Sequence, residues 1–265
     1  MRLTITHTTR YTFEAPVTYG LQQLRKTPKS YRAQSVINWK TTLGGGKNEL
    51  SFEDFHRNTV QLISLEPDIN ELIIRSEGEV EMTNTHGIVG PHSGHAPLWL
   101  FLRPTPLTKT GRATRALINE ISAEDPLERL HELSRLIRDR VSYEVGASEL
   151  SWTAEDVMAA GKGVCQDHTH VFLTCARAMG HPARYVSGFL MMDDRDHQDA
   201  THAWAEAHLQ GLGWVGFDIS NGISPDMRYV RVATGLDYLE AAPVTGMRIG
   251  GASENLSVAV KVAQQ

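Results

Sequence analysis

The first part of the chain alternates between apolar and polar positions in the manner of β-strands. Residues 3–13 alternate and are rich in β-branched side chains, as are shorter runs at residues 59–63 and 72–74. Such side chains pack well on the pleated surface of a sheet. Three consecutive glycines at residues 44–46 are typical of a turn between strands. The pattern therefore predicts an antiparallel β-rich domain over residues 1–95.

A proline- and glycine-rich segment at residues 90–97, followed by Pro104 and Pro106, predicts a boundary. Both residue types interrupt helices and sheet ladders, so we expect a second domain over residues 105–265. Between residues 111 and 141 the period becomes helical. Asp125 and Pro126 offer an N-cap and a first-turn proline for a helix. Its apolar positions, three and four residues apart, are Leu127, Leu130, Leu133, Leu136 and Ile137.

A second helix is predicted from Cys165 to Met179, because Gly180 and Pro182 end the periodic pattern. Strands are then expected at residues 183–189, 203–209 and 214–219, the last two forming a hairpin. Further strands are expected at residues 229–233, 244–249 and 256–262. The fold class is therefore α+β, with the C-terminal strands assigned to the second domain.

Composition narrows the functional classes. The 265 residues carry a formal charge of -5, so the chain lacks the basic field that nucleic-acid binding requires. No run of 18 apolar residues and no signal-like leader is present, and we expect a cytoplasmic protein with no membrane partner.

The two cysteines need separate explanations. Ten helical residues place Cys165 and Cys175 about 15 Å apart, too far for a disulfide. Cys165 lies at the predicted start of its helix, where free N–H groups and the helix dipole favour a thiolate nucleophile. The alternative for a lone cysteine is a small buried apolar residue, which suits Cys175 in mid-helix.

His202 and Asp218 lie on neighbouring predicted strands. In residues 201–209 the alanines and Leu209 share one face, and His202 lies on the other with Trp204 and Glu206. If the hairpin loop has an odd number of residues, for example residues 210–212, His202 and Asp218 become diagonal neighbours on one side of the sheet. A slip of one residue would reverse this. A carboxylate that orients an imidazole, which in turn deprotonates a thiol, is the general arrangement of an activated nucleophile.

Four segments of the chain resemble the transglutaminase-like superfamily, especially its bacterial cysteine-protease-like members. They are residues 161–167, 178–188, 202–204 and 213–218, within a core of residues 130–222. Residues 2–11 and 232–238 resemble the flanking regions of the same bacterial proteins, so the resemblance covers nearly the whole chain.

The resemblance implies a papain-like core and a cysteine peptidase or amidase that acts through a thioester. Cys165 would be the nucleophile, His202 the base and Asp218 the orienting carboxylate. The Cys165 backbone N–H would be one oxyanion donor, with Gln166 and Trp152 as candidates for the second and a packing role as the alternative for Trp152. No calcium-loop pattern is present, and we expect no cofactor and no metal ion.

Three alternatives remain open. Cys165, His168, His170 and His202 are all possible zinc ligands, although His170 points away from His168 on a helix. A non-catalytic binding protein on the same fold is the second alternative. The third is transamidation, because an amine can replace water as the acceptor of the acyl group from the thioester.

An acidic segment with aspartates at 193, 194, 196 and 199 is interpreted as a solvated loop, with gating of the site or a preference for basic substrates as the alternative. The substrate is expected to be a peptide or another amide.

Overall fold

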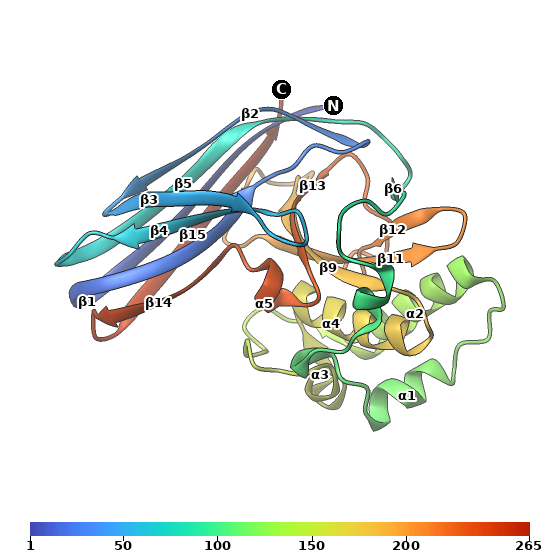
Figure 1. The fold of residues 1–265 in the computed structure, drawn as a ribbon. Coiled ribbons are helices and arrows are strands. Elements are labelled where there is room, and N and C mark those ends of the chain that lie inside the picture. The colour runs from blue at the N-terminus through green and yellow to red at the C-terminus, as the bar shows by residue number, and fades with distance from the viewer.

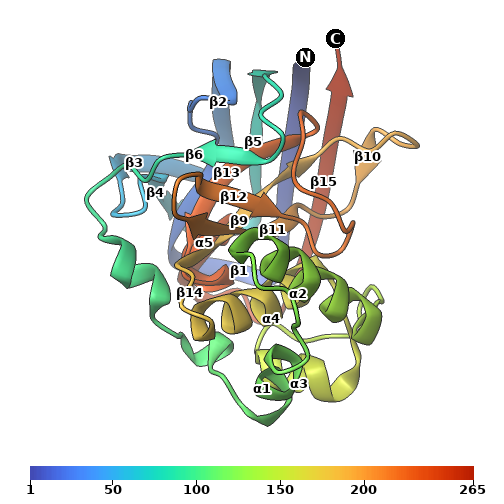
Figure 2. The same ribbon diagram turned by 90° about the vertical axis from the view of Figure 1, so that its right-hand side faces the viewer.

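The protein, described here over residues 1–265 by a computed structural model, has three layers. A large sheet, a smaller sheet and a set of helices follow one another (Figure 1), and the turned view in Figure 2 shows the same order. The smaller sheet lies in the middle, so both of its faces are covered. This confirms the α+β class and the β-rich N-terminal region.

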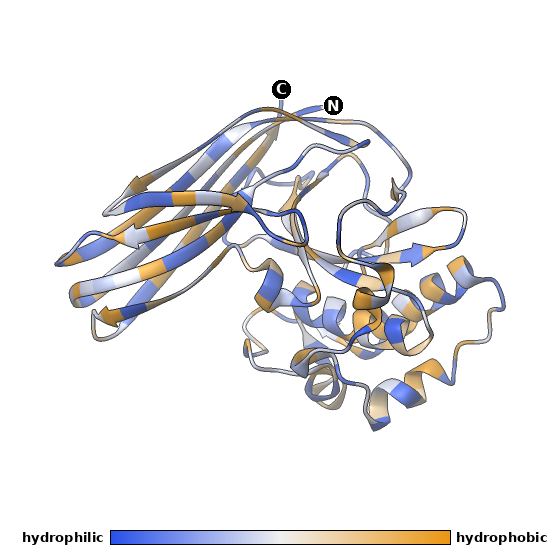
Figure 3. Ribbon diagram, viewed as in Figure 1, coloured by the Kyte–Doolittle hydropathy of each residue, from blue (hydrophilic) through white to orange (hydrophobic).

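The large sheet is built on one long strand, β1 (Arg2–Thr27). Buried and more exposed residues alternate over residues 2–13 of this strand, as the sequence pattern predicts. Figure 3 colours the ribbon by the hydropathy of each residue and shows both polar and apolar positions on the large sheet. Its first half pairs with β5 and β15, and its second half with β4 and β14. The chain turns at Gly45 (φ 80°) between β2 and β3. These strands extend the sheet, because β2 pairs with β5 and β3 pairs with β4. The other strands are β2 (Gln34–Gly44), β3 (Gly46–Glu53), β4 (Thr59–Leu65), β5 (Ile69–Met82), β10 (His197–Gln198), β14 (Val244–Gly250) and β15 (Glu254–Gln264).

The C-terminal strands belong to this large sheet and not with residues 105–240. Both β14 and β15 pair with β1, which places the two ends of the chain side by side (Figure 1). In the opposite direction β6 (Ile88–Gly90), from the N-terminal part, joins the smaller sheet through β12. The expected division into two domains at residues 95–105 is therefore wrong for these strands. The C-terminal strands join the N-terminal sheet, and β6 joins the smaller sheet. No local pattern reveals such long-range pairing.

The smaller sheet has the order β13-β9-β11-β12-β6. It contains β9 (Ala183–Leu190), β11 (His202–Leu209), β12 (Gly213–Phe217) and β13 (Tyr229–Gly235). Every residue of β9, β12 and β13 is buried, because helices cover one face and the N-terminal region covers the other. The alanine face of β11 packs on the helices as predicted.

The helix layer is centred on α4 (Cys165–Ala178), which lies against β11 and β9. As predicted, α2 (Pro126–Arg140) begins after Asp125, whose carboxylate accepts hydrogen bonds from two N–H groups of the first turn. The remaining elements are α1 (Arg112–Ile118), α3 (Ala154–Ala160), α5 (Tyr238–Ala241), the 3-10 helices Leu98–Leu102 and Pro106–Thr108, and the short parallel strands β7 (Ser142–Tyr143) and β8 (Lys162–Gly163). None of the helices combines the length and apolar character needed to span a membrane.

Candidate active site

Cys165 is the first residue of α4, and the two residues before it, Gly163 and Val164, are held in place by the Asp167 side chain. The Asp167 carboxylate accepts a hydrogen bond from the Val164 N–H (2.7 Å) and another from the Ser148 hydroxyl (2.6 Å). A Cβ on Gly163 would lie 2.7 Å from the Asp167 side chain, so only glycine leaves room for this cap. The start of the helix, and with it Cys165, is held in one position.

Two backbone N–H groups at this helix start are free. Those of Asp167 and His168 donate to the Val164 carbonyl, whereas those of Cys165 and Gln166 have no acceptor in the protein. Unpaired N–H groups at the positive end of a 14-residue helix form a site for negative charge. A negatively charged oxygen next to the Cys165 sulfur would find donors there.

His202 and Asp218 are brought together by the register of the β11–β12 hairpin. Leu209 pairs with Gly213, which leaves the three loop residues 210–212. The odd loop length places His202 and Asp218 on the same side, and His202 Nε2 lies 2.7 Å from Asp218 Oδ2. The predicted diagonal geometry is confirmed. Because Nε2 faces the carboxylate, the other ring nitrogen is left for Cys165, which lies near enough to the ring to raise the pKa of His202.

The Asp218 carboxylate is fully buried and takes part in more contacts than the sequence indicated. Besides His202, Oδ2 accepts hydrogen bonds from the Tyr229 hydroxyl (2.7 Å) and the Asn221 side-chain amide (2.7 Å). Oδ1 accepts one from the Asn221 backbone N–H (3.1 Å). Sequence reasoning missed Asn221 and Tyr229. Asn221 lies in a turn directly after Asp218, a local signal that could have identified it, but Tyr229 comes from β13, two strands away from β11.

His202 and Asp218 influence each other's charge. Burial lowers the pKa of His202, but the nearby Cys165 and the hydrogen bond to Asp218 raise it to about 10 overall. Burial raises the pKa of Asp218, yet its hydrogen bonds, first that from His202, hold it below the ordinary value. The arrangement therefore favours a protonated His202 beside an ionised Asp218.

Aromatic rings fix the plane of the His202 imidazole. Trp204 lies nearly parallel to it with 6.2 Å between ring centroids, and Tyr229 packs edge-on against Trp204 at 5.5 Å. The Trp204 ring lies directly against Gly188 of β9, the residue that pairs with His202. A Cβ at Gly188 would lie 2.5 Å from the Trp204 ring.

The other residues considered as metal ligands are engaged elsewhere. His168 donates from Nε2 to the Val141 carbonyl (2.9 Å), and its Nδ1 accepts from the Ser220 hydroxyl (2.8 Å). His170 accepts from the Tyr238 N–H, and burial lowers its pKa to about 3. No group of three or more His, Cys, Asp or Glu side chains is arranged to hold a metal ion.

Cys175 and Trp152 lie in the helical core. Cys175 is fully buried, and burial raises the pKa of its thiol. Trp152 is partly buried against the same core, and no hydrogen bond of its indole N–H to another protein group is formed. Tyr143, which the sequence did not single out, lies close to the site: burial and then the charges of Cys165 and Asp218 raise its pKa.

An open cleft of about 540 Å³ adjoins the residues that hold Asp218. Asn221 and Tyr229 line one part of it, and Met191 and Met192 another. Residues 193–195 of the acidic segment also line it, where Asp193 pairs with Arg228 (2.9 Å) and Asp194 with Arg195 (3.1 Å). Two of the four aspartates are thus balanced by arginines. Tyr143, Val145 and Leu150, in and after β7, are exposed apolar side chains.

Comparisons with known proteins agree with the fold. Residues 115–219 match the sequence model of the Transglutaminase-like superfamily, and residues 3–81 match that of the bacterial transglutaminase-like N-terminal region. An uncharacterised protein of Mycobacterium leprae is 27% identical, covering 99% of each chain. One of Mycobacterium bovis is 37% identical over 51% of this chain and 46% of its own length. The crystal structure of a suggested cysteine protease from Cytophaga hutchinsonii superposes with a TM-score of 0.81 at 17% identity, covering 99% of this chain and 90% of that one.

Proposed function

Because this chain belongs to the transglutaminase-like superfamily over residues 115–219, we propose that it is a cysteine-dependent hydrolase acting on peptide or amide bonds. Cys165 is the nucleophile, His202 the proton carrier and Asp218 the carboxylate that orients it. The single observation that carries the proposal is the 2.7 Å contact between His202 and Asp218 beside the thiol at the start of α4.

Before the substrate binds, the Cys165 proton has passed to the free ring nitrogen of His202, which gives the protonated His202 that the site favours. In the first step the thiolate attacks the carbonyl carbon of the substrate, and the oxygen that becomes negative accepts hydrogen bonds from the free N–H groups of Cys165 and Gln166. The His202 imidazolium then donates its proton to the leaving amine. The carbon–nitrogen bond breaks, and a thioester on Cys165 remains.

In the second step His202, now neutral, takes a proton from a water molecule as that water attacks the thioester. The tetrahedral intermediate collapses, and the sulfur leaves as a thiolate beside the protonated His202. The product is a carboxylic acid, and the thiolate and the imidazolium are restored. Asp218 remains ionised throughout and stabilises the imidazolium in both steps.

A peptide is the proposed substrate because an open cleft adjoins Asn221 and Tyr229, the two residues that hold Asp218. The cleft has a volume of about 540 Å³, and Tyr143, which lies close to Cys165, adds an exposed apolar side chain. The structural likeness to a suggested cysteine protease is in keeping with hydrolysis. Transamidation uses the same thioester and differs only in the acceptor, so it is the alternative activity.

Alkylation of the two thiols tests the nucleophile. With limiting iodoacetamide at pH 7, intact-mass analysis should find one label on the wild type and on Cys175→Ser, and none on Cys165→Ser. Cys175→Ser is the matched control because it also removes one thiol from α4. The label should appear about tenfold or more slowly in His202→Ala, because the imidazolium that stabilises the thiolate is gone. Labelling of Cys165 at a rate independent of His202 would instead favour a non-catalytic binding protein.

The acceptor is tested separately. A library of peptides and peptide amides is incubated with the protein, with and without a primary amine such as cadaverine, and the products are identified by mass. Cleavage in the absence of amine supports hydrolysis, whereas a product that carries the amine supports transamidation. Products formed equally by Cys165→Ser would contradict both.

A further inference from the structure

A second cavity lies on the opposite side of the smaller sheet from α4, where the sheet meets the N-terminal region. Its volume is about 150 Å³. Arg184 of β9 and Arg231 of β13 line it from the sheet, and Lys29 and Arg57 line it from the N-terminal region. The proposed catalytic residues do not line it.

The two arginines that line this cavity from the smaller sheet, Arg184 and Arg231, are deeply buried and share a single carboxylate. Arg184 is 8% exposed and Arg231 6%, while Glu206 between them is fully buried. Glu206 accepts a hydrogen bond from Arg184 Nε (2.6 Å), and Arg231 Nε lies 3.0 Å from its other oxygen. No protein acceptor is available for either terminal nitrogen of Arg231, or for Nη1 of Arg184.

The charges around the cavity do not balance. Burial, followed by repulsion from the two buried arginines, lowers the pKa of Lys29. Without Lys29, three cationic side chains, Arg57, Arg184 and Arg231, face two carboxylates, Glu53 and Glu206, which leaves one positive charge in excess. Asp54, a further carboxylate near Lys29, pairs with Arg25 (3.5 Å). Unpaired buried charge is costly, so an anion in the cavity would offset part of this cost.

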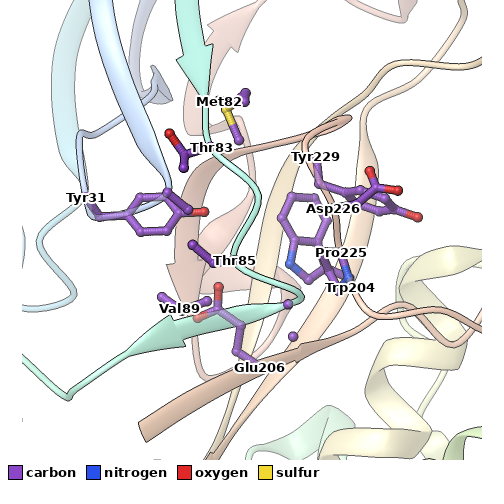
Figure 4. A pocket seen from close by; sticks show the side chains of 13 residues that line it. Tyr31, Met82, Thr83, Thr85, Val89, Trp204, Glu206, Pro225, Asp226 and Tyr229 are labelled. Atoms are coloured by element: carbon purple, nitrogen blue, oxygen red, sulfur yellow. The ribbon is translucent and has the colours of Figure 1, made fainter. Parts of the chain in front are cut away.

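The neighbouring pocket is too small and too acidic to hold such an anion. Glu206 also faces a smaller pocket of about 20 Å³, between Tyr31 on one side and Trp204 and Tyr229 on the other (Figure 4). That volume holds about one water molecule, and its acidic lining disfavours anions. The larger cavity has both the room and the free arginine donors.

We propose that this cavity binds a compact oxyanion, a phosphate or carboxylate group of a small molecule, between Arg184, Arg231, Lys29 and Arg57. Guanidinium groups present paired N–H donors that match the two oxygens of such an anion. The site is separate from the proposed active site: Glu206 lies four residues from His202 along β11, about 13 Å at strand spacing. Its ligand bridges the smaller sheet and the N-terminal region.

Titration with inorganic phosphate and with acetate, at constant ionic strength and pH 7, tests the site. Binding is followed by calorimetry and by the melting temperature. We expect saturable binding to the wild type and to Cys165→Ser, and affinity at least fivefold weaker in Arg57→Gln. The anion that binds more tightly identifies the ligand class as phosphate or carboxylate.

The matched control is Arg10→Gln. Arg10 and Arg57 are about equally exposed, at 50% and 49%, and each lies next to one glutamate, but Arg10 is on the first half of β1 and does not line the cavity. Arg10→Gln should bind like the wild type. Equal weakening in both variants, or no saturation beyond that of added sodium chloride, would overturn the proposal.

Discussion

At the scale of single residues, Asp218 helps to set the charge of the proposed active site. Replacing it in Asp218→Asn keeps the size of the side chain but removes the negative charge that helps to raise the pKa of His202 to about 10. Amide hydrolysis should fall about 100-fold at pH 7, because the imidazolium that protonates the leaving amine is less populated. The high-pH decline of kcat/KM should move from near pH 10 to lower pH, and the pH profile of the purified variant measures both.

The same change affects stability in a defined pH window. The folded-state pKa of His202 lies above its ordinary value of 6.5, so its protonated form stabilises the fold fully below that pH. The contribution is lost as the pH rises toward 10. Urea unfolding between pH 7 and 10 should therefore show a smaller loss of stability for Asp218→Asn than for the wild type. Equal slopes would mean that Asp218 does not set the charge of His202.

Gly188 gives a second test at the scale of one residue. The Cβ of Gly188→Ala would meet the Val230 carbonyl oxygen at 2.2 Å and the Trp204 ring at 2.5 Å. Overpacking of this kind costs about 1–3 kcal/mol, and Trp204 should move, which a change in tryptophan fluorescence would report. Gly44→Ala is the control, since its nearest neighbour would be 3.7 Å away and its effect should be within about 0.5 kcal/mol.

At this scale the sequence identified the residues that carry recognisable chemistry and missed those that support them. Cys165, His202 and Asp218 stood out by residue type, position and resemblance, and the hairpin register brings the last two together. Tyr229 follows Asp218 by 11 residues and reaches it only because β13 and β9 place it there. No spacing rule on one strand or helix predicts a contact that depends on the order of strands in a sheet.

At the scale of elements, the start of α4 can be tested by removing its cap. Asp167→Ala takes away the acceptor for the Val164 N–H and the Ser148 hydroxyl, which should cost about 1–2 kcal/mol. The first turn should then loosen, so alkylation of Cys165 at pH 7 should also change. Urea unfolding and alkylation rates measure the two effects.

Asp156→Ala is the control for this prediction. Asp156 holds the equivalent position in α3, where its carboxylate accepts from the Thr153 N–H and hydroxyl. It should lose comparable stability while Cys165 reacts at the wild-type rate. If both variants alter the rate equally, the cap on α4 has no specific effect on the thiol.

The elements themselves were predicted well where one periodic pattern covers them. The bounds of α2 and α4 agree with the predicted caps, and the hairpin loop falls at residues 210–212. The strand expected to reach residue 219 ends instead at Phe217, because the Asp218 carbonyl accepts from Gly222 and the chain turns there. An apolar Ile219 extended the pattern but could not indicate the turn.

At the scale of the whole molecule, the two sheets are joined by buried amide side chains. Gln34 and Asn58, from the N-terminal region, each exchange hydrogen bonds with the backbone of β13, the outer strand of the smaller sheet. They take the place of a further strand on this edge. The local sequence could not reveal this, just as it could not reveal that β15 returns to β1, because both depend on partners far along the chain.

Asn58→Ala tests whether this junction holds the molecule together. The change leaves the buried N–H and carbonyl of Thr234 without partners, which should cost about 2–4 kcal/mol. The urea midpoint should fall with little change in slope, whereas Asn48→Ala on the exposed β3 should stay within about 0.5 kcal/mol of the wild type.

The consequence should extend to the proposed active site, because β13 begins at Tyr229, which holds Asp218. If the edge of the smaller sheet loosens, Tyr229 and then the His202–Asp218 contact lose their fixed positions, and Cys165 should be alkylated more slowly at pH 7. Lost stability with an unchanged alkylation rate would limit the role of the N-terminal region to packing. A loss of both would mean that the geometry around Cys165 depends on the large sheet, which contributes none of the three proposed catalytic residues.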